Sequence, residues 1–125
     1  MTVSAFDHPL LSQLVGDDEV AAFFGFDAEL YAAIAFETAL ADVCADLDLI
    51  PREAGREIVD RLNGFRPDMA RLGAATQRDG LMVPDLVAQM RSHIGQPFAH
   101  HLHFGATSQD VTDTSLVLRL AEVLN

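Results

Sequence analysis

Apolar residues along this chain recur at intervals of three and four, and this spacing restricts the fold to packed helices. The segment from Val83 to Ile94 is a clear example, because every turn places an apolar residue on one face. Every strong periodic signal in the chain is of this kind. We therefore predict an all-α fold.

Proline, glycine and acidic residues mark where the predicted helices begin and end. Asp17 and Pro51 are typical of helix starts, whereas Gly25, Gly64 and Gly80 are typical of helix ends. We predict helices over residues 9–15, 18–24, 27–47, 51–63, 67–79, 83–94 and 108–125, and a loop over residues 95–107.

The longest predicted helix carries an apolar stripe formed by Phe36, Leu40, Val43 and Leu47. Their spacing of four, three and four predicts that this stripe is the buried face. Glu37 lies within the same stretch, and we predict that it faces solvent, because charged side chains are rarely buried.

The chain has 125 residues, which suits one domain, and a formal net charge of −11. This charge argues against nucleic acid and anionic membranes as partners, because both attract clusters of Lys and Arg. A small anionic substrate is still compatible, because local donors decide binding at a small site. Cys44 is the sole cysteine, which excludes an intrachain disulfide and indicates a reducing compartment. Without a signal peptide or membrane-length apolar run, we expect a cytoplasmic protein.

Residues 103–114 are the segment that most favours a ligand site, because a glycine-containing turn leads there into a helix. The first turn of a helix has free backbone N–H groups and a partial positive charge, which suit a carboxylate or phosphate. Gly105 permits close approach of the backbone, and the hydroxyls of Thr107 and Ser108 add donors. His103 can donate a hydrogen bond or a proton at the edge of such a site.

The same segment also has a purely structural interpretation. Thr107 or Ser108 can cap the helix, while Asp110 and Asp113 act as caps that complement its dipole. Read from physical chemistry alone, capping is the more common role for residues of these types.

The histidines His100, His101 and His103 suggest a metal site as a further alternative. No Cys or Glu lies nearby in the sequence to complete a ligand set, and the spacing matches no strong ligand pattern. We therefore expect no metal.

The run His-Phe-Gly-Ala-Thr-Ser-Gln-Asp-Val-Thr-Asp-Thr at residues 103–114 resembles the first signature region of the fumarase/aspartase superfamily. Upstream, Phe-Glu-Thr-Ala-Leu-Ala at residues 36–41, followed by Ile-Pro, is similar to the first long helix of that family and its exit. Adenylosuccinate lyases typically carry a histidine before the Asp of a second segment, where this chain has Arg78 before Asp79. The chain therefore looks more like the 3-carboxy-cis,cis-muconate cycloisomerases of the superfamily.

This resemblance implies an all-α fold with a helical N-terminal domain over residues 1–107 and the start of a central long-helix domain over residues 108–125. It implies a homotetramer that lactonises a small tricarboxylate in the protocatechuate branch of the β-ketoadipate pathway, without a metal or organic cofactor. It assigns substrate binding to His103, Thr107, Ser108 and Gln109, with Arg78 as a second anion contact and His103 as the candidate for a catalytic role.

Two further signatures of the family, which supply a histidine and a serine for proton transfer, do not occur in these residues. We therefore expect the chain alone to be inactive. Two alternatives stay open: a portion of an adenylosuccinate lyase-like enzyme, and a non-catalytic helical module for binding or assembly.

Overall fold

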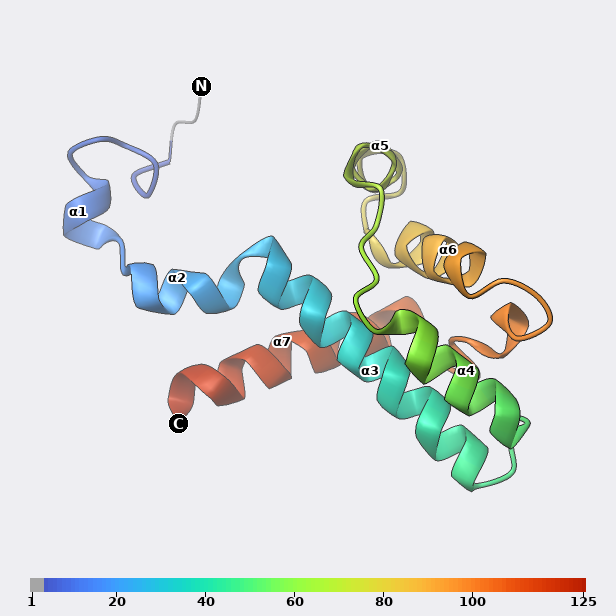
Figure 1. Ribbon diagram of the computed structural model, residues 1–125. Helices are drawn as coiled ribbons and strands as arrows, with labels where there is room; N and C mark the ends of the chain where they lie inside the picture. The colour runs from blue at the N-terminus through green and yellow to red at the C-terminus, as the bar shows by residue number, and fades with distance from the viewer. Residues whose placement is uncertain (1–3) are drawn as a thin grey trace.

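The computed structural model describes residues 4–125, and over that range it consists of helices and connecting loops without a strand (Figure 1). The helices are α1 (Ser12–Val15), α2 (Asp18–Phe24), α3 (Phe26–Asp46), α4 (Arg52–Leu62), α5 (Met69–Asp79), α6 (Val83–Ile94), the single 3₁₀ turn η1 (Ala99–His101) and α7 (Ser108–Leu124). The predicted all-α fold is confirmed.

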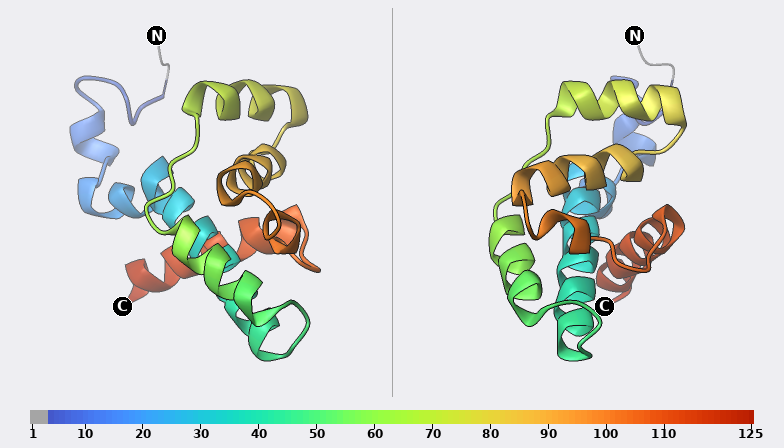
Figure 2. Two further views of the ribbon diagram at one scale, coloured as in Figure 1. Left: turned by 45° about the vertical axis from the view of Figure 1, so that its right-hand side comes forward. Right: turned by 90° about the vertical axis from the view of Figure 1, so that its right-hand side faces the viewer.

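Helix α3 is the element around which the others are arranged, because both α4 and α7 pack against it. α4 runs back along α3 after a short connection, whereas α7 crosses α3 obliquely (Figure 2). α6 packs on both α4 and α7, and α5 packs on α6. The apolar side chains of these helices and of η1 form one continuous core, to which α7 contributes Val111.

The predicted buried face of α3 is confirmed only in part: Phe36 and Leu40 are partly buried against the core, whereas Val43 is 54% exposed and Leu47 is 65% exposed. The helix instead buries a second stripe of the same periodicity, which consists of Leu30, Ala33, Glu37, Ala41 and Cys44. Small side chains on this stripe allow α4 to approach closely: a Cβ placed on Gly55 would lie 2.5 Å from the Cβ of Ala45.

The predicted helix boundaries are confirmed at several ends. The Asp17 carboxylate accepts a hydrogen bond of 3.0 Å from the backbone N–H of Val20, as an N-cap should. Gly80 ends α5 in the left-handed conformation, with φ of 77°. The apolar stripe from Val83 to Ile94 is buried, as its spacing predicts.

Helices α1 and α2 contain no buried residue; α2 contacts α3 and α7, and α1 lies beyond it at the edge of the molecule (Figure 1). Within residues 4–125, no helix is both long and apolar enough to cross a membrane. The proposed division of the chain between residues 107 and 108 stays a prediction.

Candidate functional site

The middle of the loop between α6 and α7 is held to the core. Ala99 and Leu102 are buried in the core, and the Arg91 guanidinium donates a hydrogen bond of 3.0 Å to the backbone carbonyl of Leu102. The next residue, His103, takes the left-handed conformation with φ of 61°, which residues other than glycine adopt infrequently. Gly105 then takes φ of 72°, a value for which glycine is suited.

The side chain of His103 pairs with Glu37, which corrects the prediction that Glu37 faces solvent. His103 Nδ1 lies 2.5 Å from Glu37 Oε1, and the Glu37 side chain is fully buried while that of His103 is 14% exposed. Glu37 lies on the buried stripe of α3, one turn after Ala33, so its position on the helix places it opposite the loop.

Burial of the Glu37 carboxyl raises its pKa from the ordinary value, and the hydrogen bond and charge of His103, with a smaller effect of Arg91, oppose that increase. The second carboxyl oxygen, Oε2, is buried and has no hydrogen-bond partner among the described residues. Such an atom is costly to bury, so folding stability does not account for this carboxyl.

The start of α7 is organised by Thr107 and Asp110, which form the predicted capping box. Asp110 Oδ2 accepts hydrogen bonds from the Thr107 backbone N–H at 2.7 Å and from the Thr107 hydroxyl at 2.9 Å. These bonds, with a smaller effect of His103, lower the pKa of the Asp110 carboxyl. Asp110 is therefore a cap, and the groups of Thr107 that could meet a ligand are already engaged.

Ser108 differs from Thr107, because its hydroxyl makes no hydrogen bond within residues 4–125. Its backbone N–H and that of Gln109 occupy the first two helical positions, where no carbonyl of the same helix is available to accept. The Gln109 side chain donates a hydrogen bond of 2.6 Å to Asp113, which lies one turn further along the helix. The donors that remain for an anion at this helix start therefore belong to Ser108 and Gln109.

Arg78 is not linked to this helix start. Its guanidinium forms a two-pronged pair with Asp79, with both distances at 2.7 Å, at the end of α5. α5 packs against α6. The assignment of Arg78 as an anion contact stays a prediction, and substrate binding there would require Asp79 to release it.

The histidines of the loop do not converge on a common point. The rings of His100 and His101 contact each other at an angle of 40°, with centroids 3.8 Å apart, while His103 turns to Glu37. Burial, followed by the neighbouring His100, lowers the pKa of His101. No group of three or more His, Cys, Asp or Glu side chains suited to a metal occurs among residues 4–125.

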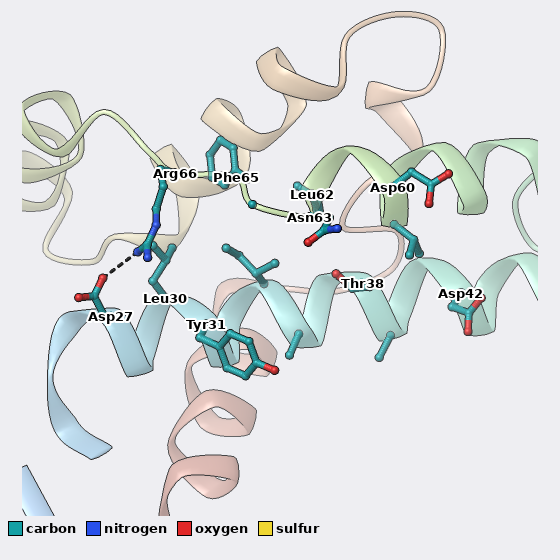
Figure 3. A pocket seen from close by; sticks show the side chains of 15 residues that line it. Asp27, Leu30, Tyr31, Thr38, Asp42, Asp60, Leu62, Asn63, Phe65 and Arg66 are labelled. Atoms are coloured by element: carbon teal, nitrogen blue, oxygen red, sulfur yellow. Dashed lines mark hydrogen bonds and ion pairs between the residues drawn. The ribbon is translucent and has the colours of Figure 1, made fainter. Parts of the chain in front are cut away.

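A separate groove of about 650 Å³ runs between α3 and α4 (Figure 3). Its walls include Tyr31 and Thr38 of α3 and Asn63 after α4, and Asp27 closes one end through an ion pair of 2.7 Å with Arg66. None of the predicted site residues lines this groove. Asp27, Asp42 and Asp60 line this groove, and its Arg66 is already paired with Asp27, so the groove is less suited to a carboxylate than the start of α7.

Comparison with known proteins links the chain to one group of enzymes. No family model matches it. It is 31% identical to trans-aconitate decarboxylase 1 of Mycosarcoma maydis, over 91% of this chain and 23% of the relative. It is 30% identical to a 3-carboxy-cis,cis-muconate cycloisomerase of Bradyrhizobium diazoefficiens, over 94% of this chain and 27% of the relative.

A solved structure shows the same helical arrangement. The crystal structure of a fumarate lyase from Mesorhizobium sp. BNC1 superposes with a TM-score of 0.81 and 34% identity, over 85% of this chain and 25% of that one. The chain thus spans about a quarter of the length of the relatives that it matches.

Proposed function

Because the chain has the fold of the helical N-terminal domain of the fumarase/aspartase superfamily, we propose that it is part of an enzyme that acts on a small tricarboxylate. In this proposal the parent enzyme is a 3-carboxy-cis,cis-muconate cycloisomerase, and the start of α7 binds one substrate carboxylate. The observation that carries the proposal is the unpaired set of donors at Ser108 and Gln109, close to His103.

The names of the relatives support a substrate with several carboxylates. Aconitate and 3-carboxymuconate, which the names of two relatives contain, are both unsaturated tricarboxylates. A site for such a substrate needs fixed donors more than it needs a positive overall charge. The helix start supplies two backbone N–H groups and one hydroxyl within two consecutive residues.

The donors also match the chemistry of lactonisation. When a carboxylate adds to a conjugated double bond, negative charge develops on a neighbouring carboxylate before a proton arrives. An enzyme lowers the barrier when preorganised donors point at the oxygen that gains this charge. In this scheme the Ser108 hydroxyl and the N–H groups of Ser108 and Gln109 stabilise that oxygen. Thr107 acts indirectly, because its bonds with Asp110 hold the helix start in place.

Assembly into a homo-oligomer is also part of the proposal. Helix α7 leaves five apolar side chains exposed over 38% or more of their surface: Leu116, Val117, Leu118, Leu120 and Leu124. An apolar helix face of this length is typical of a surface that another chain covers. We propose that a second copy of the parent protein does so, without a metal or organic cofactor.

A direct assay tests the proposed reaction. The full-length parent protein, purified without added metal, should convert 3-carboxy-cis,cis-muconate to its lactone, which is followed by the loss of ultraviolet absorption of the conjugated diene. Adenylosuccinate serves as the competing substrate. Release of fumarate from adenylosuccinate, without lactone formation, would replace this function by that of an adenylosuccinate lyase.

A further inference from the structure

The buried carboxyl of Glu37 has no role in the carboxylate site at the start of α7, and yet it contacts a residue of that site. Glu37 is fully buried, carries an oxygen without a partner among the described residues, and lies 2.5 Å from His103 Nδ1. Replacing a whole buried pair of this kind by well-packed apolar side chains of similar volume is often neutral or stabilising. Stability alone therefore gives no reason for a charged group at this position.

The contact determines which ring nitrogen of His103 is available to a ligand. A carboxylate accepts hydrogen bonds and cannot donate them, so an ionised Glu37 requires the proton of the neutral imidazole to be on Nδ1. The proton is then absent from Nε2, which makes no hydrogen bond within residues 4–125. A free neutral imidazole has no such constraint, because either nitrogen can carry the proton.

From this geometry we infer that Glu37 is a positioning residue, which fixes His103 as the Nδ1–H tautomer and presents the bare Nε2 to the substrate as an acceptor. The identity of the substrate in this inference rests on the proposed function, whereas the tautomer of His103 does not depend on it. It also changes the expected role of His103: the neutral ring accepts a hydrogen bond or proton, rather than donating one.

The partners of the loop explain how one carboxyl can have this effect. His103 adopts a left-handed backbone conformation, and the preceding carbonyl of Leu102 is held by Arg91. The His103 side chain is only 14% exposed, so the atoms packed around it restrict the ring from turning away from α3. The charged or titratable groups that act on the pair are Arg91, whose charge favours an ionised Glu37, and Asp110, whose charge interacts with His103.

In this arrangement the residues at the start of α7 and His103 bind different kinds of group on a ligand. Ser108 and Gln109 provide donors and so meet a carboxylate, whereas Nε2 of His103 provides an acceptor and so meets a group that carries a proton. The carboxylates of the proposed substrate meet the donors of Ser108 and Gln109, and Nε2 is left to accept a hydrogen bond from a water or a proton-bearing group beside the substrate.

Nitrogen NMR of the chain with labelled histidine side chains tests the inference without any ligand. Spectra are recorded at about pH 9, above the ordinary histidine pKa of about 6.5. His103 should show a protonated Nδ1 and a bare Nε2. His93 is an internal control, because its Nε2 lies 2.9 Å from the Arg61 carbonyl and must carry the proton to donate there. The two residues should therefore give opposite patterns.

Two variants separate positioning from a general effect on the fold. Glu37→Met removes the acceptor and keeps the length of the side chain, so the major form of His103 should change to Nε2–H. Glu29→Met makes the same substitution on the same helix and should leave the pattern of His103 unchanged. In both variants His93 should keep its wild-type pattern.

An Nε2–H form of His103 in the unmodified chain overturns the inference, even if Glu37→Met does not fold. Addition of 3-carboxy-cis,cis-muconate to the same samples then tests the substrate separately. If His103 shows the predicted tautomer but the ligand causes no change at residues 103, 108 and 109, the result supports the role of Glu37 and contradicts the proposed function.

Discussion

Thr107 and Ser108 are adjacent hydroxyl residues, but the fold gives them different tasks. The Thr107 hydroxyl and N–H both bond to Asp110, whereas the Ser108 hydroxyl bonds to no described residue. Thr107→Ala should therefore lower the free energy of unfolding by about 1 kcal/mol, the usual effect of losing an N-cap. Ser108→Ala should change it by less than about 0.5 kcal/mol, as expected away from a specific interaction.

Urea unfolding of the two variants, followed by circular dichroism, measures both changes. In the parent enzyme the order should reverse, and Ser108→Ala should lower turnover more than Thr107→Ala. Loss of a transition-state donor typically costs about 2.7–4 kcal/mol of activation free energy. Equal losses of stability in both variants, with turnover unchanged by Ser108→Ala, would show that both residues are only caps.

Glu37 should give the stability of the chain a specific pH dependence. Because its pKa is raised in the folded chain, the folded state holds this proton more tightly than the unfolded state does. The stabilisation from this proton is complete below the unfolded-state pKa and is lost as the pH rises through the folded-state value. Relative to Glu37→Gln, the wild-type chain should lose stability as the pH rises above about 4.3, the ordinary glutamate pKa.

Chemical denaturation of both proteins between pH 4 and about pH 8 measures the difference. Glu37→Gln is the suitable reference because it keeps the shape of the side chain and removes its titration. A difference in stability that increases in favour of the wild type over this range would mean that the folded chain favours the ionised carboxyl. The effect of burial on the pKa of Glu37 would then be smaller than that of its partner His103.

At the scale of helices, the contact between α3 and α4 depends on Gly55. A Cβ at this position would lie 2.5 Å from the Ala45 Cβ and 3.1 Å from the Ala41 carbonyl oxygen. Gly55→Ala should therefore destabilise the chain by about 1–3 kcal/mol, as overpacking of a core does. Gly73→Ala is the matched control, because its Cβ would have no neighbour within 4 Å.

Gly73→Ala should stabilise the chain by up to about 1 kcal/mol, because alanine favours helix more than glycine does. Thermal unfolding of the two variants is sufficient to establish the opposite signs. If Gly55→Ala were as stabilising as Gly73→Ala, α3 and α4 would be further apart than the structure places them.

The sequence was sufficient to predict where the helices lie, but it did not predict which face of α3 is buried. The stripe of Phe36, Leu40, Val43 and Leu47 and the stripe around Ala33 and Ala41 have the same period, so periodicity cannot choose between them. Hydrophobicity favours the first stripe, whereas the fold buries the second because small residues allow closer contact with α4. The error extended to Glu37, which was predicted to face solvent but lies on the buried stripe.

The candidate site shows the same limit at the level of contacts. The capping box of Thr107 and Asp110 follows from residues three apart and was predictable. The pair of His103 with Glu37 joins residues 66 positions apart, so no local pattern could indicate it. A carboxyl within an otherwise apolar helical stretch was the available signal.

For the molecule as a whole, the exposed apolar face of α7 leads to a prediction about assembly. Val117 is 62% exposed on that face, and Val117→Glu places a charge there without disturbing the core. We expect the parent protein to sediment as an oligomer, and we expect this variant to dissociate it in proportion to dilution. Thr112→Glu, at an exposed position near the start of the same helix, is the control and should leave the oligomer intact.

Sedimentation velocity over a range of concentrations distinguishes these outcomes. A parent protein that is monomeric at every concentration would contradict the proposed assembly. An oligomer that withstands Val117→Glu would place the interface on another surface.

The most direct test of the account is an amide NMR titration of the chain with 3-carboxy-cis,cis-muconate into the millimolar range. We predict saturable shifts that are largest at the N–H groups of Ser108 and Gln109 and that weaken in Ser108→Ala. Shifts that are absent there, or that concentrate on the groove between α3 and α4, would contradict a carboxylate site at the start of α7.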